Sequence, residues 1–140
     1  MKAIGSMFLA VAACLLLCSC GSSYGDRLVR HEIQDFHAAY NEGRYAEIYR
    51  AADEQMRKTG TEEQFTNFLA SVNQEFGKVV SSRNDSWDMR VNENRREVVL
   101  FQATQFERGS GRETFIYVLV EGKAHLLGYR LKMGDEPKEP

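Results

Sequence analysis

Hydrophobic side chains recur at helical spacing soon after residue 25. Val29, Ile33, Phe36 and Tyr40 lie three or four positions apart, so they would line one side of an amphipathic helix. Gly43 follows shortly afterwards, and glycine is common just beyond helix ends because it adopts left-handed backbone angles without strain. The pattern therefore predicts a first helix that stops at residues 41–43.

Two further helical patterns follow. The apolar stripe of the shorter one consists of Tyr45, Ile48, Tyr49 and Ala52. Met56 continues this face, and we expect the helix to break at Thr59-Gly60.

The third helical pattern has clear start and stop signals. Thr61 and Gln64 match a capping box, in which each side chain accepts a backbone N–H from the other residue. Gly77 can adopt the left-handed backbone conformation that commonly ends a helix. The apolar stripe between them consists of Phe65, Phe68, Leu69, Val72 and Phe76.

From residue 78 onward the pattern becomes that of strands. We expect strands over 79–91, 97–108, 113–121 and 124–132. Turns are predicted at 92–94, 108–111 and 121–123, where Asn and Gly gather. Because these connections are short, successive strands should pair as an antiparallel meander.

Two of the predicted strands have distinctive faces. Trp87 and Met89 should share one face of the first strand, whose polar character suits a sheet edge. The third strand is apolar on both faces, with Phe115, Tyr117 and Leu119 on one and Ile116, Val118 and Val120 on the other. One of these faces should cover the helices, and the other needs shielding by sheet curvature, a partner subunit or a ligand.

These elements predict an α+β fold. The helices come first in the chain and would pack on one face of a curved four-stranded antiparallel meander sheet.

The first nineteen residues have the pattern of a signal peptide. Lys2 precedes an unbroken apolar run over Phe8–Leu17. The run is about half the roughly twenty residues that a membrane-spanning helix needs. A buried core helix is the alternative, but the run starts close to the N-terminus and ends in a Cys-Ser-Cys-Gly-Ser-Ser cluster.

Lipid attachment is predicted at the end of this segment. The cysteines of the chain are Cys14, Cys18 and Cys20. The sequence Leu17-Cys18-Ser19-Cys20 resembles the lipobox of bacterial lipoproteins, in which a small residue precedes the cysteine that receives a thioether-linked lipid. We assign the lipid to Cys20, because cleavage before it leaves a small polar tether. Cys18 follows a bulky leucine, whereas Cys14 remains the alternative.

The resemblance to lipoproteins implies an address and a division of the chain. In such families an aspartate directly after the cysteine often retains the protein in the inner membrane. Gly21 stands there, so a Gram-negative source implies the outer membrane, facing the periplasm. The expected parts are a signal peptide (1–19), a lipidated tether (20–25), an α+β domain (26–133) and a disordered tail (134–140). The domain contains no cysteine and must fold without disulfides.

Charge is divided between the two halves of the chain. Residues 20–76 contain 6 basic and 10 acidic residues, whereas residues 77–132 contain 10 basic and 7 acidic ones. The halves either neutralise each other or give the sheet a basic surface for an anionic partner, and we favour the first interpretation. A net charge of −2 argues against nucleic-acid binding.

A family resemblance agrees with this fold. The segments that support it are Asn41-Glu42-Gly43-Arg44-Tyr45, Thr61 with Glu63, Phe76-Gly77-Lys78-Val79 and Ser82-Arg83. Together they resemble small exported bacterial domains that are similar in fold to nuclear transport factor two. The resemblance covers most of residues 26–132. It implies a curved sheet wrapped around helices as a cone, with a pocket or a dimerising sheet and no defined activity.

The polar residues offer few candidates for chemistry. His31 and Asp35 are four positions apart on the first predicted helix, where an exposed ion pair is the favoured interpretation. His37 lies on another face of that helix, so the two histidines cannot share a metal. His125 alternates in phase with Leu127 and Tyr129, as a half-buried strand residue would. We therefore assign no catalytic, cofactor-binding or metal-ligating residue.

The expected function is that of a membrane-anchored envelope lipoprotein with a non-catalytic domain. The domain would bind an envelope protein or form a homodimer through its sheet, and the membrane is reached through the lipid on Cys20. The alternative is a carrier of a small apolar ligand between helices and sheet, and an enzyme is less favoured.

Overall fold

The computed structural model describes residues 24–92 and 94–134. The helices are α1 (Tyr24–Asn41), α2 (Tyr45–Ala51), α3 (Glu54–Thr59) and α4 (Glu62–Phe76). The strands are β1 (Val79–Asn92), β2 (Arg95–Phe106), β3 (Gly109–Val120) and β4 (Lys123–Met133). The predicted signal peptide, Cys20 and residues 135–140 lie outside the described part.

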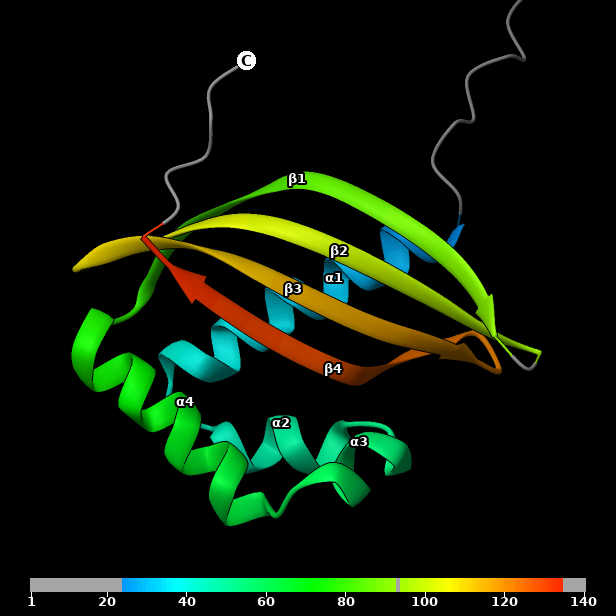
Figure 1. Cartoon of the computed structure of the whole chain (residues 1–140), viewed down its shortest axis with the longest axis horizontal. Coiled ribbons are helices and arrows are strands. Elements are labelled where there is room, and N and C mark those ends of the chain that lie inside the picture. The colour runs from blue at the N-terminus through cyan, green and yellow to red at the C-terminus, as the bar shows by residue number, and fades with distance from the viewer. Residues whose placement is uncertain (1–23, 93, 135–140) are drawn as a thin grey trace, which may run out of the picture.

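The predicted α+β class and meander are confirmed. The four strands form one antiparallel sheet in the order β1-β2-β3-β4. The sheet is curved, α1 lies across one face of it, and α2, α3 and α4 lie beyond the β4 edge (Figure 1). No described helix is long and apolar enough to cross a membrane.

Helix α1 buries the predicted apolar stripe against the sheet. Val29 and Tyr40 are almost fully buried, as are Ile33 and Phe36 between them. The helix ends at Asn41, and Gly43 has a φ of 72°, as the sequence pattern predicts.

The second helical pattern divides into two helices rather than one. The break falls at Ala52, whose backbone is extended (φ −67°, ψ 160°). The side chain of Asp53 then caps α3 by accepting the N–H of Gln55, and its own N–H donates to the carbonyl of Leu126 on β4. The prediction of a break only at residues 59–60 was wrong, because this tertiary contact with the sheet edge interrupts the helix earlier.

Helix α4 begins and ends as predicted. Thr61 and Gln64 form both hydrogen bonds of the capping box. Gly77 follows the last turn with a φ of 80°.

The predicted loop at 108–111 was misplaced. Strand β2 ends at Phe106, the turn occupies residues 107–108, and β3 already begins at Gly109. The glycines here serve close packing: a Cβ added at Gly111 would lie 2.8 Å from the Sδ of Met133 and 2.9 Å from the carbonyl oxygen of Lys132. Composition alone cannot distinguish such a glycine from a turn glycine.

The two faces of the sheet are unequal. The face toward the helices contains Val98, Leu100, Phe115 and Tyr117, all within the main core. On the outer face Val118 is fully buried although no helix lies over it. The register places Glu97 and His125 on either side of it, on the two neighbouring strands. Neighbouring side chains therefore shield part of the outer face.

Strand β4 contains a bulge that changes its phase. Ile116 pairs with Gly128 and Tyr117 pairs with Leu126, so Leu127 is an extra residue. Tyr129 consequently faces the helices with Phe115, whereas His125 pairs with Val118. The predicted common phase of His125 and Tyr129 was therefore wrong.

Candidate functional site

The interior contains a cluster of polar side chains around Glu113. Its carboxylate accepts the hydroxyls of Thr104 at 2.5 Å and Tyr129 at 2.7 Å. The Nε2 of His37 lies 2.7 Å from the same carboxylate, and Ser82 Oγ lies 3.5 Å from its Nδ1. Glu113 is only 1% exposed. The carboxyl group is stable in the interior because both of its oxygens accept a hydroxyl hydrogen bond.

Aromatic rings enclose this polar cluster. The ring of Phe36 lies 5.0 Å from that of Phe115 and 4.9 Å from that of Tyr129, and 6.0 Å from the imidazole of His37. No described buried side-chain nitrogen or oxygen lacks a hydrogen-bond partner. The cluster is therefore closed and fully paired.

Burial also fixes the protonation of the tyrosines that line the interior. Desolvation, and then the charge of Glu113, raise the pKa of Tyr129 well above its usual value. Desolvation also raises the pKa of Tyr117 well above its usual value. Both hydroxyls are protonated at neutral pH, so Tyr129 acts as a donor to Glu113.

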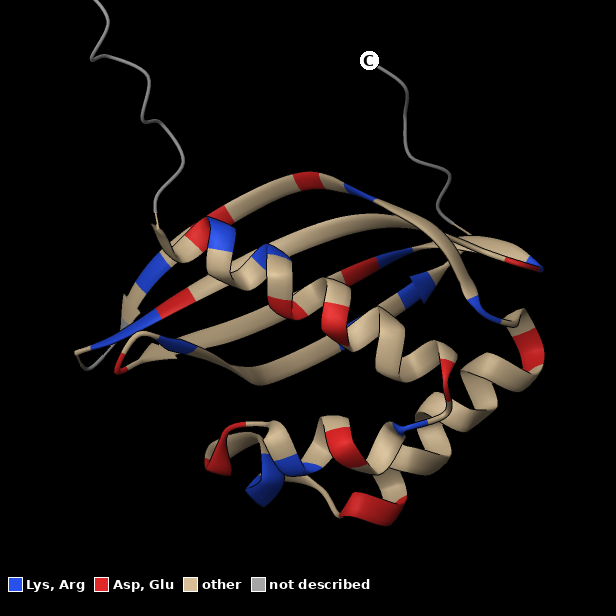
Figure 2. Cartoon of the chain, turned by 180° about the vertical axis from the view of Figure 1, so that it is seen from behind, with Lys and Arg blue, Asp and Glu red and all other residues tan. Residues whose placement is uncertain are grey.

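A pocket lies on the other side of Phe36. It is formed between α1, α2 and the strands β3 and β4, and its volume is about 200 Å³. The apolar lining consists of Phe36, Ala39, Ile48, Ala51, Tyr117, Ala124 and Leu126. The polar lining consists of Glu32, Asp35, Arg44 and Glu47. Figure 2 shows acidic positions along the part of α1 that leads toward α2.

The charges around this pocket are predominantly negative. Burial, and then the nearby Asp35, raise the pKa of Glu32 above its usual range, and the surrounding histidines oppose this shift. The guanidinium of Arg44 is already paired, at 2.6 Å with Glu42 and at 2.5 Å with Glu47. Glu32 and Asp35 therefore present negative charge that Arg44 does not neutralise.

The sequence candidates occupy different places. His31 and Asp35 form the predicted exposed pair, with Nδ1 and Oδ2 3.2 Å apart and both side chains more than 60% exposed. His37 is buried in the Glu113 cluster. The Nδ1 of His125 lies 3.4 Å from the carbonyl of Ala51. The structure thus brings only His31 and Asp35 together, and Asp35 lines the pocket.

Sequence reasoning missed Glu113, Thr104 and Tyr129. A signal was present, because Glu113 occupies the same alternating face as Phe115 and Tyr117. A carboxylate in phase with core residues is unusual unless it has partners. Those partners come from α1, β2 and β4, and they lie too far from Glu113 in the sequence for a local pattern to reveal them.

No protein-family model and no curated protein sequence matches the chain. Among solved structures, a proposed scytalone dehydratase from Novosphingobium aromaticivorans is similar, with a TM-score of 0.48 and 12% identity over 78% of this chain and 83% of that chain. Bd1075 of Bdellovibrio bacteriovorus gives a TM-score of 0.42 and 9% identity over 84% of this chain, which spans 44% of that chain. Similarity this weak carries no argument about activity.

The class of the domain follows from its own elements. Helices precede a curved, open four-stranded antiparallel meander, and α1 covers one of its faces, which is an α+β architecture.

Proposed function

We propose that this chain is a lipid-anchored protein of the bacterial cell envelope. Its domain would bind, without catalysis, a small molecule that has an apolar body and a positively charged head. The observation that carries the binding proposal is the pocket between α1, α2 and the sheet, where an apolar lining meets Glu32 and Asp35.

The size and lining of the pocket suit one compact apolar group. Its volume of about 200 Å³ exceeds the roughly 150 Å³ of an apolar protein cavity that accommodates benzene. Phe36, Ile48 and Leu126 are already buried around it, so a ligand would displace water without large rearrangement.

The charge of the pocket selects the head group. Glu32 lies in a partly desolvated position beside Asp35, where two negative charges repel each other. A ligand ammonium group near both carboxylates would relieve this repulsion, whereas a ligand carboxylate would increase it. At about 4 Å, each such charge contact is worth roughly 1–4 kcal/mol near a protein surface.

A non-catalytic role agrees with the position of the Glu113 cluster. A general acid or base must reach the substrate directly or through one water. Here Phe36 lines the pocket and lies beside the cluster, and both oxygens of the Glu113 carboxyl group already accept a hydroxyl hydrogen bond. The polar cluster therefore supports the fold.

Two ligands of similar size and opposite charge test the binding proposal. We expect the purified chain in detergent to bind 2-phenylethylamine at least about tenfold more tightly than 3-phenylpropionate, measured by calorimetry. Ile48→Trp should fill the pocket and abolish binding, and Glu32→Gln should weaken binding of the amine.

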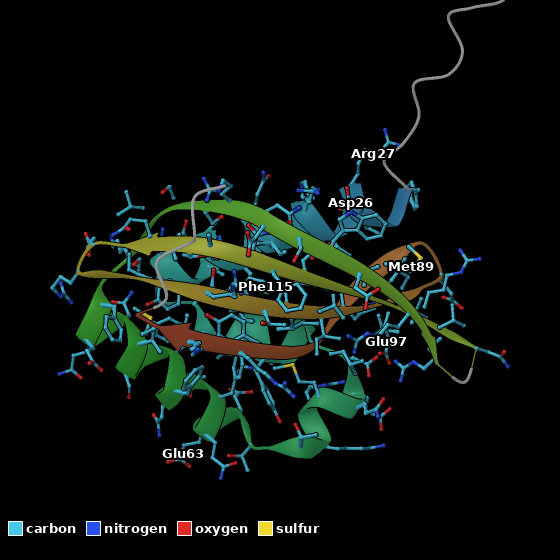
Figure 3. The ribbon with its side chains drawn as sticks, turned by 45° about the horizontal axis from the view of Figure 1, so that its top comes forward. Asp26, Arg27, Glu63, Met89, Glu97 and Phe115 are labelled. Carbon is cyan, nitrogen blue, oxygen red and sulfur yellow. The ribbon has the colours of Figure 1, made fainter. Side chains whose placement is uncertain are left out.

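Glu63→Gln is the matched control, because Glu63 lies on α4 and not in the lining of the pocket (Figure 3). Equal binding of the two ligands, or unchanged amine binding by both pocket variants, would contradict the proposal.

The anchor has a separate test. The proposal rests on the lipobox-like sequence and on the short polar tether after Cys20. Metabolic labelling with a fatty acid should mark the wild-type chain and the Cys14→Ser control but not Cys20→Ser. Continued labelling of Cys20→Ser would move the attachment site to Cys14.

Self-association through the sheet is a second candidate function. Ile116 and Phe101 lie on the outer face of the sheet, are only partly buried and have no helix over them. A second copy would remove this apolar surface from water.

A further inference from the structure

Four large apolar side chains on the start of α1 and the last part of β1 are exposed. Tyr24 is 66% exposed, Trp87 44%, Met89 38% and Val91 72%. Trp87, Met89 and Val91 alternate along the same face of β1, the face toward the helices. The start of α1 lies against this part of β1, since a Cβ added at Gly25 would be 3.8 Å from the Cε of Met89. We call these four residues the end patch.

Positive charge accompanies the end patch. Arg27 lies in the first turns of α1 and Arg96 pairs with Val91 across the β1–β2 ladder, and both are exposed. In the described part of the chain neither arginine has an ion-pair partner, whereas Asp88 pairs with Arg90 at 2.9 Å. Figure 3 shows Arg27 and Met89 at the same end of the domain, where the chain enters α1.

The proposed anchor fixes where this end must be. Cys20 precedes Tyr24 by four residues, and an extended chain spans at most about 3.6 Å per residue. Tyr24 therefore stays within roughly 14 Å of the lipid-bearing residue, which is less than two Debye lengths of about 8–10 Å each in physiological salt.

We propose that the end patch, with Arg27 and Arg96, lies on the anionic lipid headgroups of the membrane that holds the Cys20 lipid. This inference rests on the anchor of the proposed function and adds an orientation to it. Trp and Tyr prefer the interface between headgroups and acyl chains, where the ring is partly buried and its polar atom stays hydrated. Each arginine near an anionic surface adds electrostatic attraction.

The composition of the end patch also argues against a surface that is exposed only to water. The patch combines aromatic and aliphatic side chains beside these two arginines, which is the composition of an interfacial membrane surface. Helix α4 lies at the other end of the molecule, away from the start of α1 (Figure 1).

A fluorescence experiment tests the orientation directly. Trp87 is the single tryptophan of the chain, so intrinsic emission reports on the end patch alone. The processed chain is reconstituted into phosphatidylglycerol-containing vesicles, with and without bromine on the acyl chains. We expect brominated lipid to quench Trp87. Quenching should fall in phosphatidylcholine vesicles and in the Arg27→Glu/Arg96→Glu variant.

A matched control moves the reporter to the other end. Phe68 lies on α4 and is 43% exposed, similar to Trp87. The double variant Trp87→Phe/Phe68→Trp should float with vesicles as the wild type does, but its emission should not respond to bromine.

The outcomes separate this inference from the anchor. If the chain does not float with vesicles, the anchor fails and the orientation fails with it. If the chain floats but Trp87 is not quenched, or the emission of the Trp87→Phe/Phe68→Trp variant is quenched equally, the anchor stands and the orientation is wrong.

Discussion

At the scale of single residues, Glu113 links three elements. It lies on β3 and receives hydroxyls from Thr104 on β2 and Tyr129 on β4, with His37 of α1 on the same carboxylate. Because all its partners can donate, the site requires an acceptor there. The neutral amide of glutamine would direct a donor at one of them.

We therefore expect Glu113→Gln to lower the free energy of unfolding by about 1–3 kcal/mol, as a buried group loses its hydrogen bond. Urea unfolding of the variant measures this loss, with the exposed Glu63→Gln as a control that should stay near wild type. An unchanged midpoint for Glu113→Gln would show that the cluster contributes little to stability.

The raised pKa of Glu32 gives a second expectation at this scale. A carboxyl whose pKa is higher in the folded chain than in the unfolded chain destabilises the fold once ionised, so this contribution worsens as pH rises from about 4.5 through the raised value. A bound amine reverses the effect, because it favours the ionised form.

Affinity for 2-phenylethylamine should accordingly increase as pH rises through the titration of Glu32. Calorimetry at a series of pH values would show this increase in the wild type. In Glu32→Gln, the part of this pH dependence that arises from Glu32 should be absent. A pH-independent affinity in the wild type would contradict the assignment of the head-group site.

At the scale of elements, close packing between β3 and β4 depends on glycine. Gly111 faces Met133 across the ladder, and a Cβ there would approach both its sulfur and the backbone of Lys132 within 3 Å. Backbone cannot move aside as a flexible side chain can.

We expect Gly111→Ala to destabilise the fold by about 1–3 kcal/mol through overpacking. The neighbouring Ser110→Ala is the control, since Ser110 already has a Cβ. Thermal unfolding compares the two. Equal melting temperatures would mean that the end of β4 shifts without cost.

At the scale of the whole molecule, the outer face of the sheet would form the proposed contact between two copies. Arg83, Arg112 and Arg130 lie along the rim of this face around Phe101 and Ile116. Two stacked copies would bury the apolar centre but bring arginines together, so association should strengthen with salt.

Light scattering of the chain in detergent should thus show dimers that increase with salt concentration. Ile116→Lys should remain a monomer, while Lys123→Gln at the sheet's end should behave as the wild type. A wild-type monomer at every salt concentration would remove self-association as a function.

Much of the fold is determined by sequence alone. The stripe of α1, the stripe of α4 apart from the exposed Phe68, the capping box at Thr61, the alternation in β3 and the order of elements depend on neighbours along the chain. The structure confirms them. The assignment of a lipid to Cys20 also rests on local sequence, and it stays a prediction.

Tertiary structure decided the rest, because it depends on residues that are distant in sequence. Asp53 meets Leu126 and divides a helix, and a bulge at Leu127 turns Tyr129 toward the core. Glu113 acquires donors from three elements, and Tyr24 comes to lie at the same end as Trp87. Local pattern records which side chains are apolar, whereas only the folded chain determines which polar groups meet and which apolar ones stay exposed.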